Sequence, residues 1–214
     1  KLEEHALEYD MELTYDQVKA IEKANPCFRE RHFESSRPGE LLCQDTFFIG
    51  RINGIGRVNV QEIVDTYSSY AFCYLHSGKL PEHSAIVIHN DVIPQYRKWN
   101  IPIGAILTGN SYEFCGKHEH IYKHYLARTG IAHRKIPVNS PYMNGFIERF
   151  NRIVFEEFFR PVFKHNLYKS VESLQENLDA WLVYYNNKRP HHGYRNREKR
   201  PIDLINDYLK SIPA

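Results

Sequence analysis

The chain has 214 residues, of which 42% are hydrophobic and 25% charged, and its formal net charge is +2. This composition is typical of a globular protein that buries one substantial core, and the nearly neutral charge by itself favours no class of partner. No apolar run approaches the roughly 18 residues that cross a bilayer, and the first ten residues are acidic, unlike a signal peptide. We therefore expect a cytoplasmic protein with no membrane partner.

The first 36 residues predict a helical lead-in and a linker. Thr14 and Gln17 fit a capping box, Pro26 would end the helix, and residues 34–40 are polar and rich in turn formers. Stretches of branched and aromatic residues then predict three adjacent antiparallel strands, at 41–50, 56–68 and 70–78.

From residue 81 the sequence alternates between helical and strand-like patterns. Residues 81–100 have nearly helical spacing, 104–108 and 131–138 are strand-like, and Gly130 would close a short helix between those two strands. Further helices are expected at 144–163, about 169–187 and 201–211. The order predicts an α/β fold: a mixed five-stranded sheet flanked by helices, with extra N- and C-terminal helices. It suits a ribonuclease H-like core, although other α/β layouts would also fit.

Two acidic residues, Asp45 and Glu148, lie within or beside apolar parts of the predicted elements. Asp45 lies within the otherwise apolar strand LLCQDTFF, where an unpaired charge would be costly. A metal ion would satisfy it, and so would an arginine or a backbone group. Glu148 lies at the edge of a helical stripe formed by Ile147, Phe150 and Val154, so it would either lean over the end of the sheet or favour the helix dipole.

Positive charge is concentrated near the C-terminus. Residues 186–200 hold six Lys and Arg against Glu198 alone, a local sum of 6 − 1 = +5. Such a cluster would neutralise phosphates of a nucleic acid, and it would equally form a solvated loop between helices.

Four ordered motifs resemble the integrase core of bacterial insertion-sequence transposases, a branch of the retroviral integrase superfamily with an Asp, Asp, Glu triad. They are CQDTFFIG, ILTGNSYEF, NSPYMNGFIERFNR and YYNNKRPHHGY. Glu148 follows Glu113 by 148 − 113 = 35 residues. The resemblance covers about residues 37–206, taken as the catalytic core, with 207–214 as a tail. Residues 1–36 resemble the segment that joins such a core to a helix-turn-helix DNA-binding domain, which we expect before Lys1.

The resemblance implies a ribonuclease H-like fold in which three carboxylates hold two Mg²⁺ or Mn²⁺ ions. Two such ions serve the attacking and leaving oxygens of phosphoryl transfer. Asp45 matches the first Asp, which bridges both ions, and Glu148 matches the Glu, which binds one. Double-stranded DNA, a homo-oligomer on that DNA and a bacterial cytoplasm are implied as well. The residues expected to contact DNA are Asn144, Arg149, Arg152, Lys188, Arg189, Arg195 and Arg197.

The second motif departs from the family pattern. Gly109 stands where the second metal-binding Asp belongs, and Ser111 replaces a glycine. We therefore expect a core for DNA strand cleavage and strand transfer that is catalytically impaired. The alternative is a non-catalytic DNA-binding or assembly module that keeps the fold. Glu113 has a counterpart in relatives outside the triad. Asp65 and Asp91 also have matching positions there, and we interpret both as structural.

Three further features have simple interpretations. Cys115, His118, His120 and His124 offer zinc-ligand chemistry, but they are crowded into ten residues, so surface imidazoles are expected. The four cysteines include no CxxC pair, so free buried thiols are expected. Arg189 would either tie the last long helix back onto the sheet or contact DNA.

Overall fold

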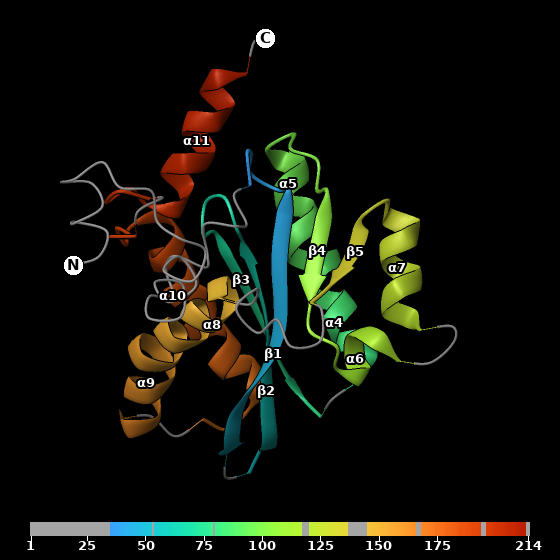
Figure 1. The fold of residues 1–214 in the computed structure, drawn as a ribbon. Coiled ribbons are helices and arrows are strands. Elements are labelled where there is room, and N and C mark those ends of the chain that lie inside the picture. Colours follow the sequence, from blue (N-terminus) through green and yellow to red (C-terminus); the bar gives the residue numbers. More distant parts are fainter. Residues whose placement is uncertain are drawn as a thin grey trace, which may run out of the picture.

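The computed structural model describes residues 35–52, 54–78, 80–116, 120–136, 145–165, 168–193 and 196–212. Five strands form one sheet with the order β3-β2-β1-β4-β5, shown in Figure 1. The first three strands are antiparallel neighbours, whereas β4 is parallel to both β1 and β5, so the predicted mixed five-stranded sheet is confirmed. The strands are β1 (Leu41–Ile52), β2 (Gly56–Asp65), β3 (Ala71–Ser77), β4 (Ala105–Thr108) and β5 (Ala132–Lys135).

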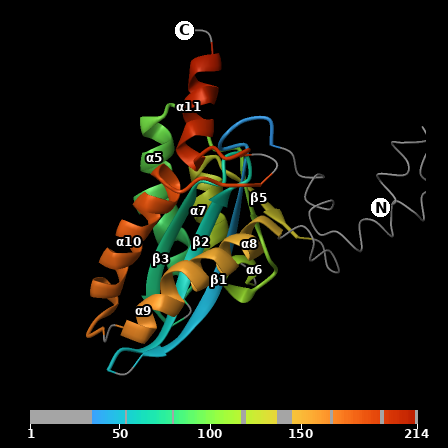
Figure 2. The ribbon, with the colours of Figure 1, turned by 90° about the vertical axis from the view of Figure 1, so that its left-hand side faces the viewer.

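Helices cover both faces of this sheet, and α8 crosses over the strands in Figure 2. One face packs on α8 (Gly145–Val154), η3 (Phe155–Phe159), α9 (Arg160–His165) and α10 (Val171–Asn187). The other packs on α4 (Pro81–Val87), η1 (Ile88–Val92), α5 (Ile93–Lys98), α6 (Tyr112–Cys115), α7 (Ile121–Thr129) and α11 (Pro201–Ser211). Successive strand residues alternate between the two cores: Cys43 and Leu107 face α8, and Leu42 and Ile106 face the other side.

The predicted helices are present, but two of them contain π-helical turns. The helix predicted at 81–100 is continuous over 81–98, and η1 ends two residues before Pro94. Proline has no N–H to donate, and a π-helical turn is one way in which a helix accommodates such a residue. The helix predicted at 144–163 is observed at 145–165 with η3 at its centre. Gly130 closes α7 with φ +73°, which confirms its predicted role as a C-cap.

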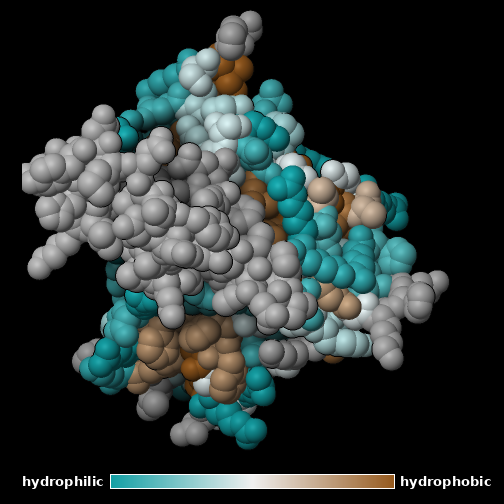
Figure 3. Space-filling model, in the orientation of Figure 1, coloured by the Kyte–Doolittle hydropathy of each residue, from teal (hydrophilic) through white to brown (hydrophobic). Residues whose placement is uncertain are grey.

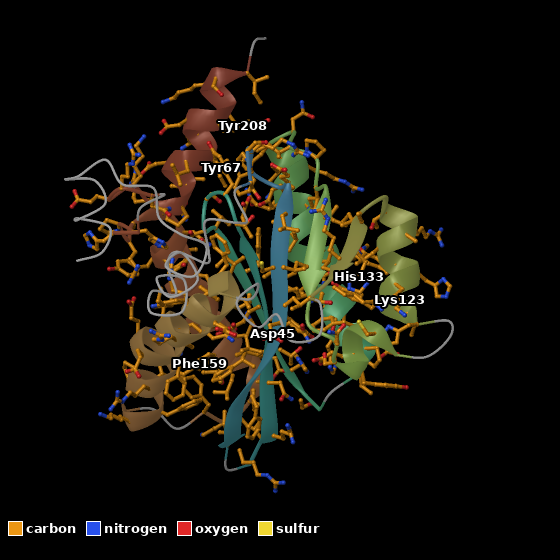
Figure 4. The ribbon with its side chains drawn as sticks, viewed as in Figure 1. Asp45, Tyr67, Lys123, His133, Phe159 and Tyr208 are labelled. Carbon is orange, nitrogen blue, oxygen red and sulfur yellow. The ribbon has the colours of Figure 1, made fainter. Side chains whose placement is uncertain are left out.

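Asp65 joins three segments at the amino-terminal end of β1. Its carboxylate accepts hydrogen bonds from the backbone N–H of Gly39 at 2.9 Å, the backbone N–H of Tyr67 at 2.6 Å and the hydroxyl of Tyr96 at 2.5 Å. Tyr67 also meets Tyr208 of α11, with ring centroids 6.2 Å apart, and both are labelled in Figure 4. These contacts support the structural interpretation of Asp65. The predicted helix that begins near Thr14 lies outside the described residues.

Candidate active site

Asp45 lies in β1 just beyond the last residue that pairs with β4. Its side chain is half-buried, and one carboxylate oxygen accepts the backbone N–H of Thr46 at 2.8 Å. Because Cys43 and Phe47 pack into the core under α8, Asp45 between them points to the same face of the sheet. Figure 4 shows Asp45 near the centre of the molecule.

Gly109 follows β4 directly beside Asp45. The parallel register ends with Gln44 opposite Thr108, so the next residue on each strand is Asp45 and Gly109. Leu107, two residues earlier, faces α8. A side chain at position 109 would therefore point to the same face as Asp45.

The structure around Gly109 does not require glycine. Its backbone is outside the left-handed region, and a Cβ added there would meet no atom of the described residues within 4 Å. The carbonyl of Gly109 accepts the Thr108 hydroxyl at 2.9 Å, and Asn110 donates its amide to the carbonyl of Ile136 at 2.7 Å. The loop is thus fixed to its neighbours, and among the described residues nothing opposes a Cβ at position 109.

Glu148 lies in the first turn of α8 and is exposed, whereas the predicted apolar stripe of that helix is buried. This helix packs on β1, the strand that carries Asp45, and on its neighbour β2. Asn151, one turn after Glu148, donates its amide to Glu62 of β2 and to the carbonyl of Ile147 at 3.0 Å. Asp45, position 109 and α8 therefore lie on one face of the sheet, with Glu148 near the start of that helix.

Glu62 is a functional candidate that the sequence reasoning missed. It lies opposite Asp45 in the β1–β2 register, is 0% exposed, and has one carboxyl oxygen without a hydrogen-bond partner among the described residues. Burial raises the pKa of the Glu62 carboxyl well above its usual value, and the neighbouring charge of Asp45 raises it further. In the sequence, Glu62 is visible only as a charged residue in a strand with many apolar residues. Its burial could not be predicted there, because it depends on the packing of α8.

No group of three His, Cys, Asp or Glu side chains in the described ranges is arranged to hold a metal ion. Among the residues considered for zinc, His118 lies outside the described residues and His124 is exposed. His120 is only 7% exposed and packs edge-on against Tyr112, so the expectation of a surface imidazole is wrong for this residue. Cys43 and Cys73 are buried free thiols, as predicted, and Cys115 is free and half-buried.

Three of the six basic residues in the C-terminal cluster are paired with carboxylates. Arg189 donates from Nε and Nη2 to Glu157, at 2.8 and 2.5 Å, which ties the end of α10 to η3. Lys199 pairs with Asp207 at 2.8 Å, and Arg200 with Asp203 at 2.6 Å. Among the other residues expected to contact DNA, Arg149 is half-buried, whereas Arg152, Lys188 and Arg197 are exposed. Asn144 and Arg195 lie outside the described residues.

Comparisons with known proteins point to one superfamily. The family model described as Integrase core domain matches residues 129–198. Over 187 residues the chain is 26% identical to the "Putative integrase ORF3" of Spiroplasma virus SpV1-C74. That match covers 82% of this chain and 49% of the viral protein, so the chain spans about half the length of this relative.

Several solved integrases share the fold. A chain of the simian T-cell lymphotropic virus intasome, solved with the PP2A regulatory subunit B56 gamma, has a TM-score of 0.65 at 15% identity, over 81% of this chain and 56% of that one. The HTLV-2 integrase catalytic core in complex with magnesium gives 0.59 at 14% identity, over 80% and 99%. The catalytic core of BIV integrase gives 0.57 at 17% identity, over 81% and 95%. The fold, the integrase core model matched over residues 129–198 and the viral relative all show similarity to proteins of the integrase and transposase superfamily.

Proposed function

We propose that the chain is the core of a bacterial insertion-sequence transposase, which cleaves DNA strands and joins them to a target, and that its chemistry is impaired by Gly109. One observation carries this proposal. Position 109 lies beside Asp45 and faces the same side of the sheet, no described atom lies within 4 Å of a Cβ placed there, and glycine supplies no carboxylate.

The donor set present does not fit a two-ion site. Mg²⁺ and Mn²⁺ are bound by oxygen ligands, and Asp45 and Glu148 are suitable donors. In the family that this chain resembles, a third carboxylate completes the site for the two ions, and Gly109 cannot supply it. The described residues also contain no three-ligand group. We therefore infer that phosphoryl transfer is weak or absent in this chain.

A second candidate function is a DNA-binding or assembly module without catalysis. It is favoured by the same absence of a three-ligand group in the described ranges, together with an intact sheet and helical layers. Both candidates share double-stranded DNA as the partner, and we propose that at least two copies of the chain assemble on it. Among the described helices, none has the length and apolar composition that crossing a bilayer requires.

Substitution at position 109 separates the two candidates. We expect Gly109→Asp to bind Mn²⁺ in calorimetry more tightly than the wild type, because it adds an anionic ligand beside Asp45. On DNA carrying the ends of the cognate element, we expect a gain in strand transfer on the order of 10³-fold, the factor that corresponds to several kcal/mol of transition-state stabilisation.

Gly109→Asn is the matched control, because it has nearly the same shape without the charge. We expect it to resemble the wild type in both measurements. Strand transfer by the wild type at the level of Gly109→Asp would refute the impaired-enzyme proposal. Equal Mn²⁺ binding by the Asp and Asn variants would refute the assignment of position 109, whatever DNA is supplied.

A further inference from the structure

The β1–β2 pair continues beyond the end of β4 as a two-stranded hairpin. β4 pairs with β1 only from Leu41 to Gln44, whereas β1 runs on to Ile52 and pairs there with β2 alone. In Figures 1 and 2 this hairpin extends past the sheet, beyond the end at which β4 stops. Asp45 lies where the hairpin leaves the sheet, so the hairpin continues directly from the candidate active site.

The two faces of the hairpin differ in character. One face is apolar: Phe47 meets Phe155 of η3 edge-on at 6.0 Å, and Ile49 and Ile52 pack against the same core. In Figure 3 the hydrophobic area in the lower part of the surface lies over η3 and α9. The opposite face holds Phe48, which is 43% exposed. That second face is therefore the one left open to solvent.

Two arginines lie directly across from each other on this open face. Arg51 is opposite Arg57 in the β1–β2 register, and both are exposed. The guanidinium of Arg57 lies 4.4 Å above the ring centroid of Phe48. Like charges placed opposite each other destabilise a strand pair, and no carboxylate of the described residues forms an ion pair with either arginine. An anionic partner would relieve this repulsion.

The C-terminal cluster differs from the hairpin in its ion pairs. There Arg189, Lys199 and Arg200 each have a carboxylate partner, so three of the six positive charges that the sequence places at 186–200 are already neutralised. At the hairpin neither Arg51 of β1 nor Arg57 of β2 has an ion-pair partner among the described residues.

We propose that the β1–β2 hairpin is a phosphate-binding arm, in which Arg51 and Arg57 contact the backbone of a DNA duplex that lies on the open face of the hairpin. This inference rests on the proposed function and adds the DNA-binding element. Asp45 points to the face under α8, so the arm holds the duplex from the other side of the β1–β2 pair. Phosphate contacts carry no base specificity, so the arm holds DNA of any sequence.

The experiment compares two double variants that each remove two positive charges. Affinity for a duplex of arbitrary sequence is measured by fluorescence anisotropy over a series of salt concentrations. Each phosphate contact contributes about 0.9 to the slope of log affinity against log salt. We expect Arg51→Gln with Arg57→Gln to reduce that slope by about 1.8. We expect Lys199→Gln with Arg200→Gln to leave it unchanged.

Further controls separate charge from folding. Arg51→Lys with Arg57→Lys keeps both charges and should keep the slope, and circular dichroism checks that each variant is folded. If the Gln variant of the hairpin does not fold, the single Arg51→Gln variant is expected to reduce the slope by about 0.9. Equal slopes for the hairpin and C-terminal double variants would overturn the inference. A wild-type chain with no salt-dependent DNA affinity would instead overturn the proposed function.

Discussion

At the scale of single residues, Glu62 is a fully buried carboxyl group next to the candidate active site. A carboxyl group directly across a strand pair from Asp45, and fully buried, is costly to ionise because it loses hydration and faces a like charge. The amide of Asn151 is its hydrogen-bond donor, which connects Glu62 to the helix that carries Glu148. Glu62 therefore affects both the stability of the fold and the position of α8.

We predict that Glu62→Gln stabilises the protein in a pH-dependent way. The pKa of Glu62 is raised in the folded chain, so its favourable contribution is present at low pH and is lost as pH rises from the unfolded pKa towards the folded one. Gln has no proton to lose and can still accept from Asn151. We expect its free energy of unfolding to exceed that of the wild type by at least roughly 1 kcal/mol at pH 8, with a smaller difference at pH 5.

Urea unfolding from pH 5 to pH 8 measures this difference. The exposed Glu176→Gln on α10 is the control and should show no trend with pH. A Glu62→Gln variant that is less stable than the wild type at every pH would contradict the account.

At the scale of secondary-structure elements, α10 covers the open edge of the sheet. β3 is an edge strand, and such strands leave unpaired backbone groups that invite aggregation. The side-chain amide of Asn186 accepts from the N–H of Ala71 and donates to its carbonyl, both at 2.9 Å. Gln175 accepts the N–H of Leu75 at 2.7 Å and donates to the carbonyl of Cys73 at 3.2 Å. Side chains thus take the place of a sixth strand.

We predict that Asn186→Leu destabilises the protein by about 2 kcal/mol or more, because it leaves two buried backbone groups of Ala71 unsatisfied. The neighbouring Asn187→Leu is the matched control, since the side-chain amide of Asn187 donates to the carbonyl of Val183 in its own helix. Thermal unfolding compares the two variants. Similar losses in both would show that the edge contacts contribute little to stability.

At the scale of the whole molecule, the sequence predicts the layers but not the interactions between them. Alternating and helical patterns were sufficient to predict all five strands and the long helices, because such patterns indicate which side of each element is buried. The register shift between Phe48 and Gly50, the short helix α6 and the burial of Glu62 depend on neighbours distant in the sequence. The sequence also left the role of Arg189 open, because the residue that pairs with it, Glu157, lies 32 residues earlier.

The proposed assembly on DNA predicts a change in mass. We expect at least two copies of this chain to come together on paired DNA ends. Light scattering with and without such DNA should give at least twice the mass of one chain in the complex. A single copy under both conditions would contradict the proposed assembly.

The unobstructed space at Gly109 also has a genetic consequence. A GGU or GGC glycine codon becomes an aspartate codon through one base transition, and a Cβ at this position meets no atom of the described residues within 4 Å. A gene for this chain that uses either codon is therefore one point mutation away from the third carboxylate of the proposed site.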